Sequence, residues 1–238
     1  MADSKVSASI LGVFLLAAAA VLGYQLSDAA IRFKQLDRSV TVKGLAEREY
    51  PADVVIWPIQ YIVASNNLEQ LYGELDRQAE SIRAFLLLGG IEPGEISDSP
   101  PAITDKSAQQ YGSNNGAEFR YTALRTVTVY STNIDRVRSV MEGLSQLGRQ
   151  GIVLSGNEYQ SKPDYLFTRL NEIKPGMIEE ATRNAREVAQ KFASDSDSQL
   201  GKIRKASQGQ FSIADRDKNN PHIKQVRVVS TVEYYLSD

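Results

Sequence analysis

The chain has 238 residues, of which 42% are hydrophobic and 24% are charged, so most of it can bury a core. Dividing this length by a typical domain of about 150 residues gives one to two domains. Its 27 Lys and Arg residues against 29 Asp and Glu residues give a net charge of -2, which excludes a generally basic nucleic-acid binder. With no cysteine and a single histidine, His222, the sequence excludes cysteine-based zinc sites, disulfide frameworks, thiol nucleophiles and CxxC redox motifs.

The N-terminal segment Val6–Ser27 carries no charged residue. A membrane-spanning helix needs about 20 residues, and signal-peptide apolar cores are usually shorter. We therefore expect a signal anchor that enters the membrane through residues 6–26, with residues 1–38 forming the anchor and its stalk. Ala18-x-Ala20 also allows a second interpretation, a signal peptide that is cleaved.

The charges around this segment give its orientation only weakly. Arg32, Lys34 and Arg38 follow it and Lys5 precedes it, and a positive-inside count of these residues would place the bulk of the chain in the cytoplasm. The count is small, and a short arm before a first apolar segment is also typical of exported proteins. The residues alone leave the orientation open.

After residue 39, apolar positions recur with the periods of strands and helices. The strand patterns cover residues 40–44, Asp53–Val63, Ile96–Ile103, Glu118–Tyr130, Ile152–Tyr159, Tyr165–Leu170, Lys202–Ser207 and Gln225–Leu236. Helical patterns cover three segments. The first is residues 68–86, capped by Asn66 and ended by Gly89-Gly90, and the second is residues 133–148. The third begins at Pro175, and its apolar face consists of Ile178, Ala181, Ala185, Val188, Ala189 and Phe192.

This order is two strands and a helix, three times, and then two strands. It predicts an α+β fold with a mixed or antiparallel sheet packed by about three helices, in repeated β-β-α units, preceded by one N-terminal transmembrane helix. Pro58 predicts an edge or a bulge in its strand, and Pro100-Pro101 an interruption. Tyr111–Gly116 has the composition of a turn, so the strand after it should return as a hairpin.

Three segments, in this order, resemble the SIMPL domain, a family of unknown function found in bacterial periplasmic and outer-membrane-associated proteins. They are Val40-Thr-Val-Lys-Gly44 followed by Pro51-Ala-Asp53, then Tyr121-Thr-Ala123 before Val127-Thr-Val129, and finally the alanine-spaced stretch Glu180–Ala193 before Leu200-Gly-Lys-Ile203. Arg120 stands where the family usually has glycine. The resemblance covers about residues 39–237.

The resemblance implies an exported protein, so we expect residues 39–238 to form one periplasmic domain, held in the inner membrane by a single pass or released after cleavage. It also implies a possible role in stress protection and assembly into an oligomer. The family has no established catalytic residues, so the resemblance transfers none. Without cysteine, a stress role cannot use a thiol redox cycle.

Two segments have residues that could ligate a metal, and both have a simpler interpretation. His222 could bind a metal with Asp215 and Asp217, but an exposed loop histidine is the ordinary interpretation. Asp195-Ser-Asp197-Ser-Gln199 has oxygen ligands at alternate positions, yet it lacks the glycine and the glutamate of a calcium loop. A solvated helix end is the better interpretation, and we expect no metal and no cofactor.

Other polar residues are also best explained as surface. The carboxylate pairs Glu47 with Glu49 and Glu179 with Glu180 need a pocket before they can act as acid and base. The cations Arg183, Arg186 and Lys191 form a solvated helix face, with a smaller chance of contacting anionic lipid or a partner. Trp57 is expected in the core, and the polar segments 104–117 and 208–222 are long enough to reach a neighbouring subunit.

The sequence contains no GxGxxG, Walker, GxSxG or HExxH pattern. We therefore expect a non-enzymatic protein that forms a homo-oligomer or binds an envelope protein, with no nucleic-acid partner. The alternative is an enzyme or small-ligand binder whose pocket uses carboxylate, Tyr and Arg side chains. A deep pocket that gathers several buried polar residues would favour this alternative.

Overall fold

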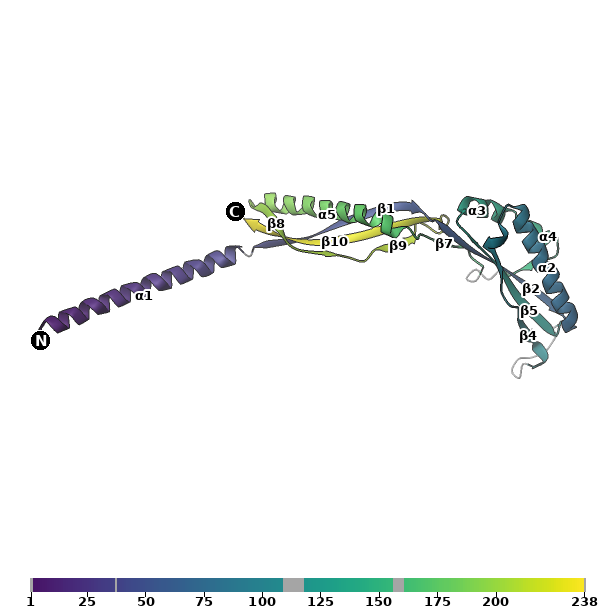
Figure 1. The fold of residues 1–238 in the computed structure, drawn as a ribbon, viewed down its shortest axis with the longest axis horizontal. Coiled ribbons are helices and arrows are strands. Elements are labelled where there is room, and N and C mark those ends of the chain that lie inside the picture. Colours follow the sequence, from purple (N-terminus) through teal and green to yellow (C-terminus); the bar gives the residue numbers. More distant parts are fainter. Residues whose placement is uncertain (1, 37, 109–117, 156–160, 238) are drawn as a thin grey trace. The chain divides into compact units, whose positions relative to one another are not determined.

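The computed structural model describes residues 2–36, 38–108, 118–155 and 161–237 (Figure 1). The helices are α1 (Ala2–Leu36), α2 (Leu68–Leu88), α3 (Ile134–Glu142), α4 (Ser145–Arg149) and α5 (Leu170–Asp195), with the 3-10 turns η1 (Pro93–Glu95) and η2 (Lys106–Ala108). The strands are β1 (Ser39–Pro51), β2 (Val54–Ser65), β3 (Ile96–Asp98), β4 (Ala102–Asp105), β5 (Tyr121–Ser131), β6 (Val153–Leu154), β7 (Asp164–Leu166), β8 (Gln199–Gln208), β9 (Ser212–Asp215) and β10 (Ile223–Ser237).

The chain divides into two compact units, each assembled from separated segments. Unit 1 comprises Met1–Glu47, Ile173–Ser212 and Arg227–Asp238, and unit 2 comprises Arg48–Glu172 and Ile213–Val226. Helices and antiparallel strands occur together, which confirms the predicted α+β class. The predicted boundary between residues 38 and 39 lies inside unit 1, and the assignment of residues 39–238 to one domain stays a prediction.

Helix α1 contains the apolar N-terminal segment. Its window Gly12–Ala29 is long and apolar enough to cross a membrane, and no residue of this window is buried. A helical segment whose apolar side chains are exposed all round is typical of a segment that lies in a membrane. The helix therefore has the properties of either a membrane anchor or a signal sequence.

In unit 1, the alanine-spaced face of α5 packs on a sheet whose strand order is β1-β10-β8, with β9 also paired to β10 (Figure 1). Leu236 N donates to Arg38 O at 2.8 Å, which places the start of β1 beside the end of β10. Alternate positions of both strands are buried, and they pack with Ala185 and Ala189 of the helix. The small helical side chains let the backbones of helix and sheet approach closely.

The ends of α5 differ from the sequence prediction. The helix begins at Leu170, so Pro175 is its sixth residue and lies inside it, not at its first position. Only the first four N–H groups of a helix have no intrahelical partner, so proline at the sixth position gives up one intrahelical hydrogen bond. Val188 and Phe192 are 40% and 56% exposed, so they belong to a flank of the helix and not to its buried face, which also includes Met177.

In unit 2, α2 packs on a six-stranded sheet in which β5 and β2 are central, in the order β3-β5-β2-β6. The period-two face predicted for β2 is confirmed, since its members are at most 5% exposed: Val55, Trp57, Ile59, Tyr61 and Val63. On one side β5 pairs with β2 from Val55 to Ser65. On the other side β7 pairs with residues 54–56 and β6 with residues 61–62, so the predicted edge at Pro58 is the gap between them.

Most local predictions for unit 2 hold, with shifts of a few residues. The strand predicted over 96–103 is broken at Pro100-Pro101 into β3 and β4, and both pair with β5. The pair Asp105 and Tyr121 closes the predicted hairpin, while its turn at 111–116 lies outside the described residues. The helix predicted over 133–148 is two helices, α3 and α4, and the chain turns between them at Gly143. A Cβ added at Gly143 would lie 3.4 Å from the Phe85 ring.

The N-terminal cap of α2 is Asn67, one residue after the predicted Asn66. Asn67 Oδ1 accepts from Gln70 N at 3.1 Å. Asn66 instead bonds the hairpin, with its Oδ1 accepting from Arg120 N at 2.8 Å. The strands expected over 152–159 and 165–170 are only β6 and β7, because α5 takes up residue 170 and residues 156–160 lie outside the described part.

Candidate functional site

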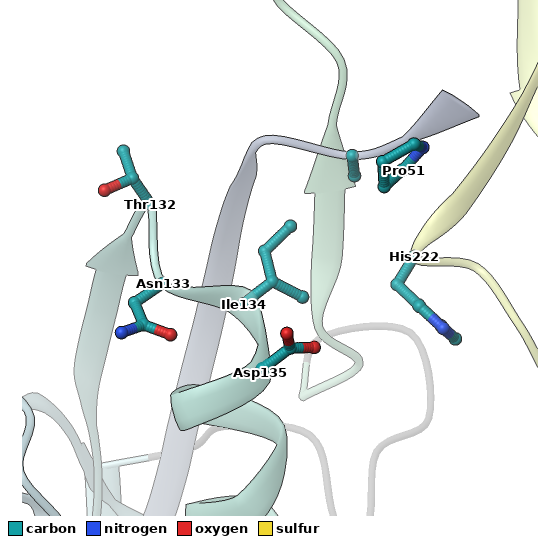
Figure 2. A pocket seen from close by; sticks show the side chains of 7 residues that line it. Pro51, Thr132, Asn133, Ile134, Asp135 and His222 are labelled. Atoms are coloured by element: carbon teal, nitrogen blue, oxygen red, sulfur yellow. The ribbon is translucent and has the colours of Figure 1, made fainter.

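One pocket in unit 2 has a volume of about 390 Å³ and lies at the start of α3 (Figure 2). Its walls come from the end of β1, the first turn of α3 and the residue before β10: Pro51, Ala52, Thr132, Asn133, Ile134, Asp135 and His222. Asn133 Oδ1 already accepts from Arg136 N at 3.1 Å and so caps the helix. The pocket therefore offers one carboxylate and one imidazole beside a helix N-terminus whose cap is occupied.

His222 is fixed in this pocket by its backbone and its ring. Its carbonyl accepts from Ala52 N, and its ring meets the Tyr165 ring edge to face at a centroid distance of 6.1 Å. Partial burial lowers the pKa of His222, and the positive charges of Arg138 and Arg216 act in the same direction. The imidazole is therefore neutral at pH 7 and can accept a proton or a hydrogen bond.

Metal binding by His222 with Asp215 and Asp217 is the less favoured interpretation of the sequence, and the structure gives both carboxylates other partners. Asp215 pairs with Lys224, and Asp217 pairs with Arg216 at 2.9 Å while accepting hydrogen bonds from Asn219 and Asn220. These contacts hold the pKa of Asp217 down, at about 2, with Arg216 as the main cause. Within the described residues, His, Asp and Glu side chains form no group of three that could hold a metal ion.

The segment Asp195–Gln199 is a helix end, as the sequence analysis preferred. Asp197 has a φ of 51°, Asp197 N donates to Ser194 O at 3.2 Å, and Ser198 N donates to Ala193 O at 2.9 Å. These two bonds define a Schellman motif, in which the residue after the helix takes the left-handed conformation. The alternating oxygens of the segment thus belong to the termination of α5.

The carboxylate pairs also have ordinary partners. Glu47 lies 3.8 Å from Arg227, and Glu49 lies 3.6 Å from Arg216, so each glutamate has an arginine partner. Exposed pairs of this kind contribute about 0–1 kcal/mol. The remaining predicted residues lie on α5, where Glu179, Arg183, Arg186 and Lys191 are exposed and Glu180 is half-buried.

Two further predictions concern Trp57 and the long polar segments. Trp57 is 3% exposed, so its place in the core is confirmed. The segment 104–117 contributes two residues to β4 and forms η2, while residues 109–117 lie outside the described part. The segment 208–222 contains the short strand β9 and is therefore not a simple loop. Contact of either segment with a neighbouring subunit stays a prediction.

A second pocket, of about 280 Å³, lies between α2 and the Pro100-Pro101 break and contains a charged network. Arg125 projects from the helix-facing side of β5, and its side chain is 18% exposed. Its Nε donates to Ser99 O at 3.2 Å and its Nη1 donates to Asp76 Oδ1 at 2.9 Å. Asp98, on the same pocket wall, pairs with Arg83. Two carboxylates and a largely buried guanidinium therefore meet in one place.

Tyr61 adds a buried hydroxyl behind this network. It lies directly opposite Arg125 in the β2–β5 ladder, and its OH donates to Leu75 O at 2.9 Å. Burial raises the pKa of Tyr61 to about 12, although Arg125 opposes this effect. The hydroxyl is therefore protonated at neutral pH and acts as a donor, so it stabilises the wall of the pocket and does not serve as a base.

The sequence analysis did not identify this second pocket. Arg125 was visible as a charged residue between apolar positions of a strand, and a charge at an inward position is a signal of a buried polar contact. Asp76 and Asp98 gave no such signal, because both occupy positions where a surface carboxylate is ordinary. Only the fold places them next to Arg125.

Comparison with known proteins gives one family. The family model described as "SIMPL: Protein of unknown function (DUF541)" matches residues 40–233. The match spans both units, from β1 to the last third of β10. A search of curated proteins finds no match to the chain.

Proposed function

Because the chain belongs to the SIMPL family and carries a long apolar N-terminal helix, we propose that it is a single-pass inner-membrane protein with its C-terminal part in the periplasm. There it acts without catalysis, by self-association or by binding an envelope protein. The observation that carries the proposal is α1, whose window Gly12–Ala29 is long enough to span and has no buried residue. Release as a soluble periplasmic protein after cleavage is the alternative location.

Exposed apolar and strand surfaces of unit 1 support an interaction role. Phe192 and Val188 lie one helical turn apart on a flank of α5 and are 56% and 40% exposed, so a partner that covered them would gain free energy from their burial. Among the described residues, β1 and β8 form the two edges of the sheet. Lys202 and Lys205 on β8 are typical of a guarded edge, which favours β1 as the edge for strand pairing.

Light scattering on the full chain in detergent tests self-association. We expect a mass larger than one protein chain, which falls toward one chain in Phe192→Asp. The matched control is Tyr72→Asp, since Tyr72 is 45% exposed on α2 of the other unit and should leave the mass unchanged. A single-chain mass at micromolar concentration, with no envelope protein captured, would contradict the proposal. A role in stress protection would not use thiol chemistry, because the chain has no cysteine.

The second pocket supports the alternative function of a small-ligand binder or enzyme. Arg125, Asp76 and Asp98 are polar groups that converge on a pocket of about 280 Å³, beside the exposed ring of Tyr72. Thermal unfolding with inorganic phosphate or acetate tests it, since a ligand that binds the folded state raises the Tm. A Tm increase in the wild type that is absent in Arg125→Gln would favour this alternative over the non-enzymatic one.

A further inference from the structure

We propose that the open face of the unit 1 sheet lies on an anionic phospholipid surface. This inference rests on the anchor in the proposed function. The face is the side of the sheet opposite α5, and it carries outward residues of β1, β10 and β8.

The alternation of side chains defines this face. On β1 the buried positions are Val42, Gly44 and Ala46, next to α5. Thr41, Lys43, Leu45 and Glu47 therefore point to the other side, and all four are exposed. On β10 every second position is buried, at Val228, Ser230, Val232 and Tyr234. The positions between and beside them, which include Arg227, Glu233 and Tyr235, therefore lie on the open side.

Strand β8 adds cations to the same side. Lys205 is the register partner of Glu233, and the Arg204 guanidinium lies 5.7 Å from the Tyr235 ring centroid, so both belong to the open face. The β8–β10 register shifts between Tyr234 and Leu236, whose partners are Ile203 and Leu200. Lys202 lies within this shift, level with Tyr235 of the open side, and is exposed.

The charge of this face is positive. It has five cations, Lys43, Lys202, Arg204, Lys205 and Arg227, and two carboxylates, Glu47 and Glu233, so five minus two leaves three positive charges. The two carboxylates are already in salt bridges, Glu233 with Arg204 at 3.0 Å and Glu47 with Arg227 at 3.8 Å. Leu45 and Tyr235, which are 41% and 39% exposed, lie among the lysines. Cations with interspersed apolar and aromatic side chains are the composition that binds the headgroup region.

The anchor brings this face to the membrane. From Ala29, the last residue of the apolar window, to Arg38 is nine residues, and α1 remains helical to Leu36. At 1.5 Å per helical residue as far as Leu36 and at most about 3.5 Å for each of the two residues after it, Arg38 lies within about 18 Å of the hydrocarbon boundary. The headgroup layer itself is roughly 5–8 Å thick, and charges act across a further Debye length of about 8 Å. Arg38 is bonded to Leu236 and to Ser198 beside β8, so the sheet begins at the outer edge of this range.

A single fluorophore on the full chain tests the proposal, because the absence of cysteine allows clean labelling. Thr41→Cys places the label on the open face. Val188→Cys places it on α5, next to Ala189, which packs with Val42, so the two labels lie at matched positions along β1 on opposite sides. Quenching by a headgroup-labelled lipid is measured after reconstitution into vesicles of phosphatidylglycerol or of phosphatidylcholine.

We expect stronger quenching at Thr41 than at Val188 in phosphatidylglycerol vesicles, and equal quenching in phosphatidylcholine vesicles or at high salt. Each lysine near an anionic surface strengthens partitioning to that surface about fivefold. Partitioning of the sheet should therefore be roughly a hundredfold weaker in the triple variant Lys43→Gln, Lys202→Gln, Lys205→Gln, and the difference in quenching between the two labels should disappear. The matched control Arg183→Gln, Arg186→Gln, Lys191→Gln removes the same amount of charge from α5. This control should still show the difference in quenching between the two labels.

Equal quenching of the two labels in phosphatidylglycerol vesicles would overturn the proposal, as would a contrast that survives in the triple lysine variant. Flotation of the unlabelled chain with the vesicles is scored separately. A chain that floats without a contrast contradicts only the lipid-facing sheet. A chain that fails to float contradicts the anchor and, with it, this inference.

Discussion

At the scale of single residues, Gly44 controls how closely α5 approaches its sheet. A Cβ added at Gly44 would lie 1.9 Å from Ala181 O and 2.4 Å from Ala185 N. These are backbone atoms of a helix, which cannot rotate away as a side chain can. The glycine is therefore required by packing, and it pairs with the alanines of α5 to make the close contact.

We predict that Gly44→Ala destabilises the protein by about 3 kcal/mol, at the upper end of the usual cost of overpacking. Urea unfolding followed by circular dichroism measures it. Gly176→Ala on α5 is the control, since its added Cβ meets no atom within 4 Å. That variant should be more stable by up to about 1 kcal/mol, because alanine favours a helix over glycine. Equal stability of the two variants would show that α5 does not approach the sheet at Gly44.

His222 predicts a pH dependence of stability. Its pKa is lowered in the folded protein, mainly by burial, so the unfolded chain binds a proton more readily. The stabilisation is complete above the ordinary pKa of about 6.5 and is lost as the pH falls through the lower folded value. The urea midpoint should therefore decrease from pH 7.5 to pH 5.5, and less so in His222→Asn. Carboxylates titrate mostly below this window, near pH 4. An identical decrease in both proteins would contradict the assignment to His222.

At the scale of elements, the sequence predicts the existence of each helix better than its ends. Apolar spacing identified α2 and α5, since their buried residues recur every three or four positions. The ends depend on single hydrogen bonds that spacing cannot reveal. Asn66 and Asn67 are equally suitable caps by residue type, and only the hairpin contact to Arg120 assigns Asn66 elsewhere. Val188 and Phe192 fit the apolar period of α5, but the fold leaves that flank of the helix exposed.

We predict that Asn67→Ala destabilises unit 2 by about 1 kcal/mol, because Gln70 N loses its acceptor at the start of α2. Asn67→Ser should retain nearly full stability, since a serine hydroxyl caps a helix about as well. Thermal unfolding of the three proteins measures the difference. Equal Tm values for Asn67→Ala and Asn67→Ser would mean that Asn67 does not cap the helix.

The candidate sites were predictable only in part, because spacing along the sequence does not reveal contacts between residues that are distant in the chain. The interpretation of Asp195–Gln199 as a helix end is confirmed, because that segment is local in the chain. The second pocket joins α2, β3, the Pro100-Pro101 break and β5, four elements spread over more than fifty residues of sequence. No local pattern connects Asp76 with Arg125. Such sites require the register of the sheet, which places Arg125 opposite Tyr61.

At the scale of the whole molecule, the account combines a SIMPL domain with an N-terminal apolar helix. The family match over residues 40–233 and the α+β fold are both established by comparison and structure. The membrane, the periplasmic side and the assembly are our proposals. They depend on one physical premise, that α1 stays attached to the folded part and is buried in a bilayer.

Cell fractionation of a C-terminal alkaline phosphatase fusion tests this premise most directly, because the enzyme is active only after export. The account predicts phosphatase activity in the membrane fraction that survives a carbonate wash, on a protein of full-length mass. Activity confined to the soluble periplasmic fraction, on a protein shortened near Ala20, would show that the segment is a cleaved signal peptide. An inactive fusion in the membrane would contradict the periplasmic orientation.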